Sequence, residues 1–232
     1  MILGEGASFH EVEALKDQMG LNAPIIVQYF NYLKDLLVNR DLGTSYISKL
    51  PVWDDLKSRL PATITIAGGS VIMMVVIAVP VGVISAVKQY SIVDNLTMFF
   101  AMLLCSMPAF FFGLIAMLIF SLKLGLLPSV GIGSFKHFIL PWCTCCSVYL
   151  AQLVRMTRSN MLEVIRADYI RTARAKGAAE RVIVIKHALR NALLPVITIV
   201  GINFGAMLGG AVITENIFSI AGVGTMTVNG IR

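Results

Sequence analysis

Charged side chains are scarce in this chain, at 14% of its 232 residues. They are missing altogether from four stretches, which are 60–87, 95–122, 137–154 and 191–214. Soluble domains carry roughly 25% charged residues, so this composition excludes a soluble fold. Each stretch reaches the roughly 17–25 residues that a helix needs to cross a bilayer. Because the runs also lack the alternation of a membrane β-barrel, we predict an all-α polytopic membrane protein with four spans in this chain.

The third stretch, 137–154, is the least secure of the four predicted spans. It is the shortest, and it contains His137, Pro141 and Gln152. A re-entrant or tilted segment therefore stays open as an alternative there.

The absence of Asp, Glu, Lys and Arg from the four stretches also bears on function. Ion-coupled carriers often place such groups near the bilayer midplane, and many contain internal repeats, which this sequence does not show. A secondary transporter or channel without ATP coupling is therefore the alternative rather than the preferred hypothesis. An intramembrane enzyme is disfavoured because no histidine accompanies the candidate nucleophiles in a defined motif; these are Ser70, Ser85, Ser106 and Cys143.

Cysteine is also sparse, and the four cysteines all fall inside predicted spans: Cys105, Cys143, Cys145 and Cys146. That placement argues against a disulfide framework. The CTCC cluster lacks a CxxC pair, and only His137 lies nearby as a further soft-metal ligand. We predict buried apolar cysteines and no metal site.

The net charge of +6 is concentrated in one loop, 155–190, where nine basic residues face three acidic ones. The rest of the chain sums to zero. The positive-inside rule predicts that this loop is cytoplasmic and that 1–59, with six basic and eight acidic residues, is extracytoplasmic. A basic loop tied at both ends to spans is explained by topology, which disfavours nucleic-acid binding.

The basic loop (155–190) has helical spacing up to Gly177. Helical spacing resumes after Gly177 and continues beyond the loop to Pro195, where the last span opens. Tyr169, Ala173 and Lys176 share one helix face, with Asp168 and Thr172 beside them. A small residue among aromatic and charged groups suits a helix that lies in a partner's groove. A solvated basic loop held near anionic lipid is the alternative.

The last stretch carries glycines at every fourth position, Gly201, Gly205 and Gly209, which predicts a flat face for close helix packing. Asn203 lies in the same stretch and requires a protein or watery environment, so it is a candidate residue of a translocation path. Ser106 is a second candidate, because Pro108 predicts a kink beside it.

Several motifs together resemble the inner-membrane permeases of bacterial ABC importers of the dipeptide, oligopeptide and nickel class. DYIRTARAKG and KHALRNALLPVIT resemble their EAA loop, and further matches are EVEALKDQMGLNAPIIVQYFNYLKDLL, DLGTSY, RLPATITIA and ENIFSIAGVGTM. In the last motif, Ala221 stands where that family usually has proline. The resemblance covers almost the whole chain.

This resemblance implies a type I importer permease, with 60–232 as its transmembrane domain. It implies a second homologous permease, two ATPase subunits that hold ATP and Mg, and an extracytoplasmic substrate-binding protein. Asp168 to Gly177 would form the ATPase-coupling helix, with the EAA core at Thr172, Ala173 and Arg174. The chain itself lacks a GxxxxGK(S/T) loop, so we expect no bound cofactor and no enzymatic activity.

The resemblance also implies six spans, one before the 1–59 segment and one after the ENIFSIAG motif. We expect both to be missing here, as in a truncated chain. The substrate stays open between peptides, a nickel chelate and related solutes, because selection rests heavily on the binding protein.

Overall fold

The computed structural model describes residues 10, 13, 16, 21–45 and 49–231. Within these residues the chain is helical, apart from turns and one isolated antiparallel bridge between Thr44 and Pro51. The chain divides into two units, of which the first comprises 1–59 with 232 and the second 60–231. The long helix α3 (Val52–Val87) contains the division. The sequence HEVEALKDQMG, whose spacing predicts an amphipathic helix that ends at Gly20, lies mostly outside the described residues.

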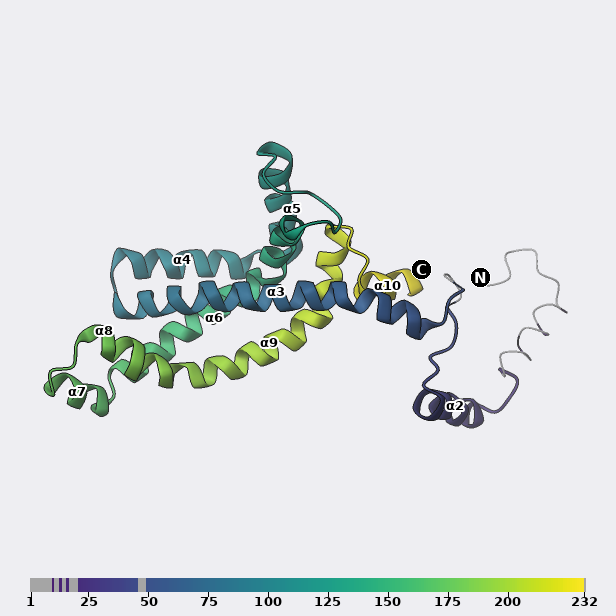
Figure 1. The fold of residues 1–232 in the computed structure, drawn as a ribbon, viewed down its shortest axis with the longest axis horizontal. Helices are drawn as coiled ribbons and strands as arrows, with labels where there is room; N and C mark the ends of the chain where they lie inside the picture. Colours follow the sequence, from purple (N-terminus) through teal and green to yellow (C-terminus); the bar gives the residue numbers. More distant parts are fainter. Residues whose placement is uncertain (1–9, 11–12, 14–15, 17–20, 46–48, 232) are drawn as a thin grey trace. The chain divides into compact units, whose positions relative to one another are not determined.

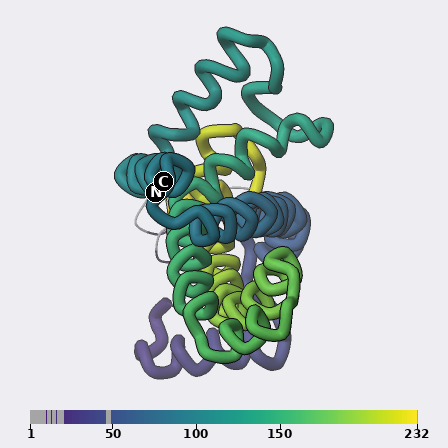
Figure 2. Tube along the Cα trace, turned by 90° about the vertical axis from the view of Figure 1, so that its left-hand side faces the viewer, coloured from purple at the N-terminus to yellow at the C-terminus, as the bar shows by residue number. Residues whose placement is uncertain are grey.

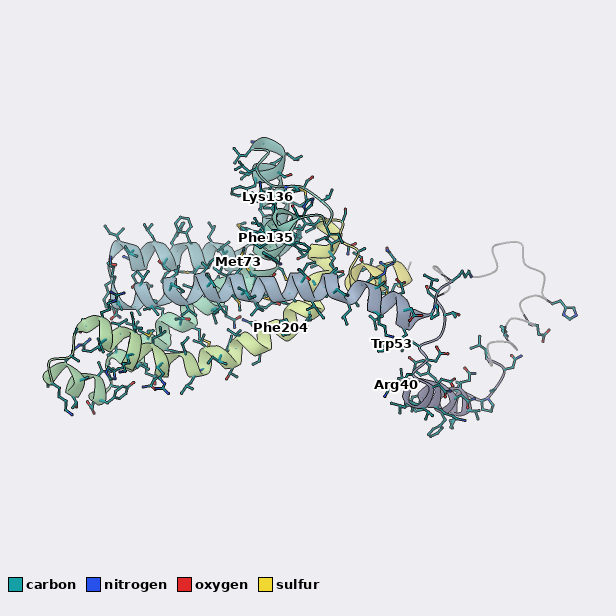
Figure 3. All side chains as sticks on the ribbon, viewed as in Figure 1. Arg40, Trp53, Met73, Phe135, Lys136 and Phe204 are labelled. Atoms are coloured by element: carbon teal, nitrogen blue, oxygen red, sulfur yellow. The ribbon has the colours of Figure 1, made fainter. Side chains whose placement is uncertain are left out.

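The first unit contains α2 (Ile25–Lys34), which continues into the π-helix η1 (Asp35–Asn39). The amide of Gln28 donates to the backbone oxygens of Leu21 and Ala23 at 3.0 and 2.7 Å, so its side chain closes the turn before α2. The helix ends at Arg40, labelled in Figure 3, whose φ of 52° lies in the left-handed region. The start of α3 carries Trp53, with the ammonium of Lys57 5.1 Å from the centre of its ring.

The second unit is a helical bundle in which α6 (Phe135–Ile165) contacts α4, α5 and α9 (Figure 1). Helix α3 also packs on α6, where the indole N–H of Trp142 donates to the backbone oxygen of Thr65 at 2.9 Å. The remaining elements are α4 (Ile92–Ser106), α5 (Ala109–Ala116), η2 (Met117–Lys123), α7 (Asp168–Ala175), α8 (Glu180–Val182), η3 (Ile183–Leu189), α9 (Arg190–Ile217) and α10 (Val223–Ile231).

The predicted spans are found as three long helices and one broken one. Val52–Val87, Phe135–Ile165 and the helix Glu180–Ile217 are each long and apolar enough to cross a membrane. The fourth candidate is the pair α4 and α5–η2, which bends by 106° at its break (Figures 1 and 2). The break falls at Met107, whose extended backbone is the conformation that a following proline favours. The irregular span is therefore the second one, whereas the third stretch lies within one continuous helix.

Glycines allow the helices of the second unit to approach closely. A Cβ at Gly82 of α3 would lie 2.8 Å from the backbone oxygen of Val154 on α6, and one at Gly113 of α5 would lie 2.7 Å from Thr144. At the opposite end from α10, a smaller apolar cluster joins α3, α6, the basic loop (155–190) and the start of α9 (Figure 1). This loop cluster consists of Ala86, Met161, Ile170, Ile183, Ala188 and Ala192.

Candidate functional site

The basic loop (155–190) is built differently from the continuous helix predicted up to Gly177. Helix α6 runs on to Ile165, and the chain then breaks at Arg166 and Ala167. Ala167 has an extended backbone and precedes α7, which is a separate helix of 8 residues, Asp168–Ala175. The sequence did not signal this break, because the residues around it are all compatible with a helix.

Gly177 ends α7 in a turn whose backbone conformation requires glycine. Its φ is +80°, a conformation that side chains other than glycine rarely adopt. The amide of Gly177 donates to the oxygen of Arg174 at 2.9 Å, and that of Ala178 donates to the oxygen of Ala173 at 3.2 Å. These bonds satisfy the last carbonyls of α7. A Cβ at Gly177 would meet no atom within 4 Å, so backbone conformation is the constraint rather than space.

Helix α7 has one buried and one exposed face. Ile170 is fully buried in the loop cluster, and Ala173 is half-buried against it. The outer face consists of Asp168, Arg171, Thr172 and Ala175, all exposed. Tyr169 and Lys176 are also exposed, on the flank. Ala173 therefore lies at the border of the buried face, on the same side of α7 as Tyr169 and Lys176.

Two polar contacts hold α7 against the chain that follows it. The amide of Asn191, at the start of α9, donates to the hydroxyl of Tyr169 at 2.8 Å. The guanidinium of Arg174 donates to both carboxylate oxygens of Glu180, at 3.1 and 2.6 Å. These bonds raise the pKa of Arg174 above its ordinary value. The two side chains are 41% and 58% exposed, so the pair contributes at most about 1 kcal/mol.

A buried ion pair lies on the same side of the bundle as α7. Asp94, 1% exposed at the start of α4, accepts two hydrogen bonds from the guanidinium of Arg158 on α6, at 2.6 and 2.7 Å. The hydroxyl of Ser85 and the amide of Tyr90 also donate to this carboxylate. The network joins the ends of α3, α4 and α6. Sequence reasoning missed it, although both charged residues stand just outside uncharged stretches.

A second carboxylate is buried at the other end of the bundle. Glu215, on the last turns of α9, is fully buried and accepts from the hydroxyl of Thr63 at 2.6 Å and the amide of Thr225 at 2.9 Å. Thr63 in turn accepts from the amide of Val223 at 2.9 Å. Glu215 therefore fixes the segment after α9 to α3.

Comparison with known proteins identifies the family. Residues 78–232 match the family described as binding-protein-dependent transport system inner membrane component, and residues 1–67 match the N-terminal region of the same kind of component. The chain belongs to this family. It is a multi-pass helical permease subunit of an ABC importer in the inner membrane.

Similar permeases have been named in several bacteria. A dipeptide transport system permease of Alkalihalophilus pseudofirmus is 41% identical, over 96% of this chain and 75% of the relative. A glutathione transport system permease of Escherichia coli is 38% identical, over 100% of this chain and 76% of the relative. The family is the membrane component of such transporters, not their catalytic subunit, and it works in general with ATPases and binding proteins.

The predicted path residues of the permease lie in different surroundings. Asn203 is buried within the chain, between α3 and α9, with its amide nitrogen 4.0 Å from the sulfur of Met74. Ser106 is exposed at the end of α4, and its hydroxyl donates to the oxygen of Met102 at 2.9 Å. Ser106 therefore lies at the broken span, whereas Asn203 lies inside the bundle.

The glycines at every fourth position of α9 are exposed on this permease. A Cβ at Gly201, Gly205 or Gly209 would meet no atom within 4 Å. The close approach predicted for this row is therefore not made within the described residues. Close approaches are made at other glycines, among them Gly82 and Gly113.

The cysteines of the permease are free thiols, and Cys145 and Cys146 are buried. The thiol of Cys143 lies 3.5 Å from the sulfur of Met73, which Figure 3 labels on α3. No group of three or more His, Cys, Asp or Glu side chains that could hold a metal is found in the described part of the chain.

Proposed function

We propose that this permease forms part of a translocation path for peptides or a related solute such as a nickel chelate, and that partner ATPases drive it through the outer face of α7. The observation that carries the coupling role is the division of α7 into an anchored face and a free one. Ile170 is fully buried, whereas Thr172 and Ala175 are exposed on the opposite side. A partner can therefore bind the helix without displacing its anchor.

The anchor gives α7 a route to the membrane helices. Ile170 contacts the cluster to which α6 contributes Met161 and α9 contributes Ala192. Because packed interiors transmit displacement rather than absorb it, a push on α7 would move α6 and α9. The Gly177 turn and the break at Ala167 let α7 move as one unit between two states of the transporter.

The finer composition of the transporter is also part of the proposal. We expect two ATPase subunits that hold ATP and Mg, a second homologous permease and an extracytoplasmic binding protein. The basic loop (155–190) would face the cytoplasm, as its charge of +6 indicates. The contact surface would comprise the outer face of α7, which includes Asp168 and Thr172. Tyr169, Arg174 and Lys176 would border that surface, and Ala173 and Gly177 would support it.

The coupling role is tested by changing the outer face of α7 while leaving its anchor in place. We expect Thr172→Trp and Ala175→Trp to abolish both co-purification of the ATPases and ATP-dependent uptake, because a bulky side chain would prevent close docking. Lys186→Trp is the matched control, since Lys186 is exposed in the same loop but lies on η3. Equal loss in the control, or full activity in both α7 variants, would remove α7 from the docking surface.

The substrate class is tested in proteoliposomes that contain the complete transporter and its binding protein. The relatives named for dipeptide and for glutathione transport make peptides the first substrates to try. We expect ATP-dependent uptake of a radiolabelled dipeptide or of glutathione. Uptake of a nickel chelate alone would assign the second class, and equal uptake without ATP would favour the uncoupled transporter instead.

A further inference from the structure

An apolar groove bordered by charged residues lies where the end of α3 meets α8 and η3. Its volume is about 350 Å³. The apolar lining consists of Val83, Ile84, Val87, Val184 and Ile185, and the rim of Lys88, Glu180 and Arg181. The largest of these apolar side chains are about half exposed, with Ile84 at 48% and Ile185 at 53%. The groove thus presents apolar surface that the described residues leave uncovered.

The charged residues beside the groove carry a positive net charge once the pairing of Glu180 with Arg174 is taken into account. Glu180 is already bound by Arg174 through two hydrogen bonds. Lys88 and Arg181 form no ion pair within the described residues. Lys88 and Arg181 line the groove with the apolar parts of their side chains, and both cations are without an anionic partner in the described part of the chain.

The position of the groove along the chain matches the depth of lipid headgroups. Lys88 is the first charged residue after the uncharged stretch 60–87, and Arg181 lies in the basic loop (155–190). Long basic side chains at the end of a span extend toward the interface, while the apolar residues of the last turns remain at acyl-chain depth. Anionic lipids give the cytoplasmic leaflet a negative surface potential that attracts such cations.

We propose that this groove binds one anionic phospholipid, with its acyl chain against Ile84 and Ile185 and its phosphate between Lys88 and Arg181. The combination of apolar floor and cationic rim favours a lipid over another protein helix, whose apolar face would leave both cations without a counter-charge. The bound lipid would lie directly after the Gly177 turn, in contact with the segment that carries Glu180.

The test uses the complete transporter in nanodiscs of phosphatidylcholine that contain a phosphatidylglycerol with a photoactivatable acyl chain. We expect the label to map to peptides around residues 83–88 and 181–185. The double variant Lys88→Gln with Arg181→Gln should reduce this labelling by about tenfold or more, because each cation near an anionic surface contributes about 1 kcal/mol. The matched control, Lys186→Gln with Arg190→Gln, removes the same charge from the same loop outside the groove and should keep the labelling.

A second variant tests the groove independently of charge. Ile84→Trp fills the apolar floor and leaves both cations in place, so it should also reduce the labelling. If the Lys88→Gln, Arg181→Gln double variant fails to assemble, the labelling of Ile84→Trp decides whether the groove binds lipid. The proposal is overturned if a photoactivatable phosphatidylcholine labels the groove equally, if neither variant lowers the labelling, or if the groove cross-links to another subunit of the transporter instead.

Discussion

The two ends of the transmembrane unit each bury one carboxylate, but they hold it in different ways. Asp94 is bound by the guanidinium of Arg158, by Ser85 and by the amide of Tyr90. Glu215 is bound by a hydroxyl and a backbone amide, from Thr63 and Thr225. One end is thus joined by opposite charges and the other by uncharged donors.

The two carboxylates therefore illustrate two ways of holding helices together in a membrane protein. The bonds of Asp94 join three helices, α3, α4 and α6, next to the anchor of α7. The bonds of Glu215 fix a short return segment, so that α10 can follow α9 closely. Loss of Asp94 leaves the charge of Arg158 without its partner, whereas loss of the Glu215 carboxylate leaves only uncharged donors behind. The two ends should therefore respond differently to removal of one group.

The largest effect is expected from breaking the charge pair on one side only. Asp94→Asn keeps the side-chain shape but leaves Arg158 without its counter-charge, and it should destabilise the permease by about 3 kcal/mol. The double variant Asp94→Asn with Arg158→Gln should recover much of this loss. The measurement is thermal unfolding of the purified transporter in detergent. A single variant no less stable than the double would show that the charge of the pair does not matter.

The next effect tests the steric enclosure of Glu215. A Cβ at Gly224 would lie 2.6 Å from the Cα of Val212 and 2.8 Å from a carboxylate oxygen of Glu215. Because a backbone atom cannot easily move, Gly224→Ala should cost about 2 kcal/mol. Gly230→Ala is the control on the same helix, since a Cβ there would meet no atom within 4 Å. Equal melting temperatures for the two variants would contradict the close packing of α10 on α9.

Replacement of Glu215 itself should be milder than that of Asp94. Glu215→Gln retains one acceptor oxygen and leaves no cation stranded, so we expect a cost of about 1–2 kcal/mol. Thr63→Val removes the hydroxyl that bonds both Glu215 and Val223, and should cost about as much. If Glu215→Gln destabilises the permease as much as Asp94→Asn under the same conditions, the contrast between the two ends is wrong.

Much of the fold could be predicted because membrane helices follow from local composition. The uncharged stretches 60–87, 137–154 and 191–214 each lie within a long helix. Pro108 correctly indicated a kink in the second stretch, but its size of 106° depends on what α5 packs against. Of the loop, Gly177 was visible as a helix end, whereas the break at Ala167 was not, since no proline or glycine marks it.

The contacts between residues far apart in the chain could not be predicted from the sequence. Asp94 and Arg158 are 64 positions apart, and Thr63 and Glu215 are 152 apart, so only the packing of α3, α4, α6 and α9 brings them together. Helical periodicity likewise grouped Tyr169, Ala173 and Lys176 on one face of α7 without indicating which side of the helix is anchored. Gly201, Gly205 and Gly209 show the same limit, since their spacing indicates a flat face but not its partner.

The smallest effect is expected at a third carboxylate, which tests whether burial rather than ion pairing separates the two ends. Glu180 is bound by Arg174 through two hydrogen bonds, as Asp94 is by Arg158, but both side chains of the Arg174–Glu180 pair are exposed. Solvent screens such a pair, so Glu180→Gln should change the stability by no more than about 0.5 kcal/mol. Thermal unfolding at low and high salt measures this, and any small loss should disappear at high salt. A loss near that of Asp94→Asn would show that α7 depends on this ion pair to stay in place, and that the anchor at Ile170 is not sufficient.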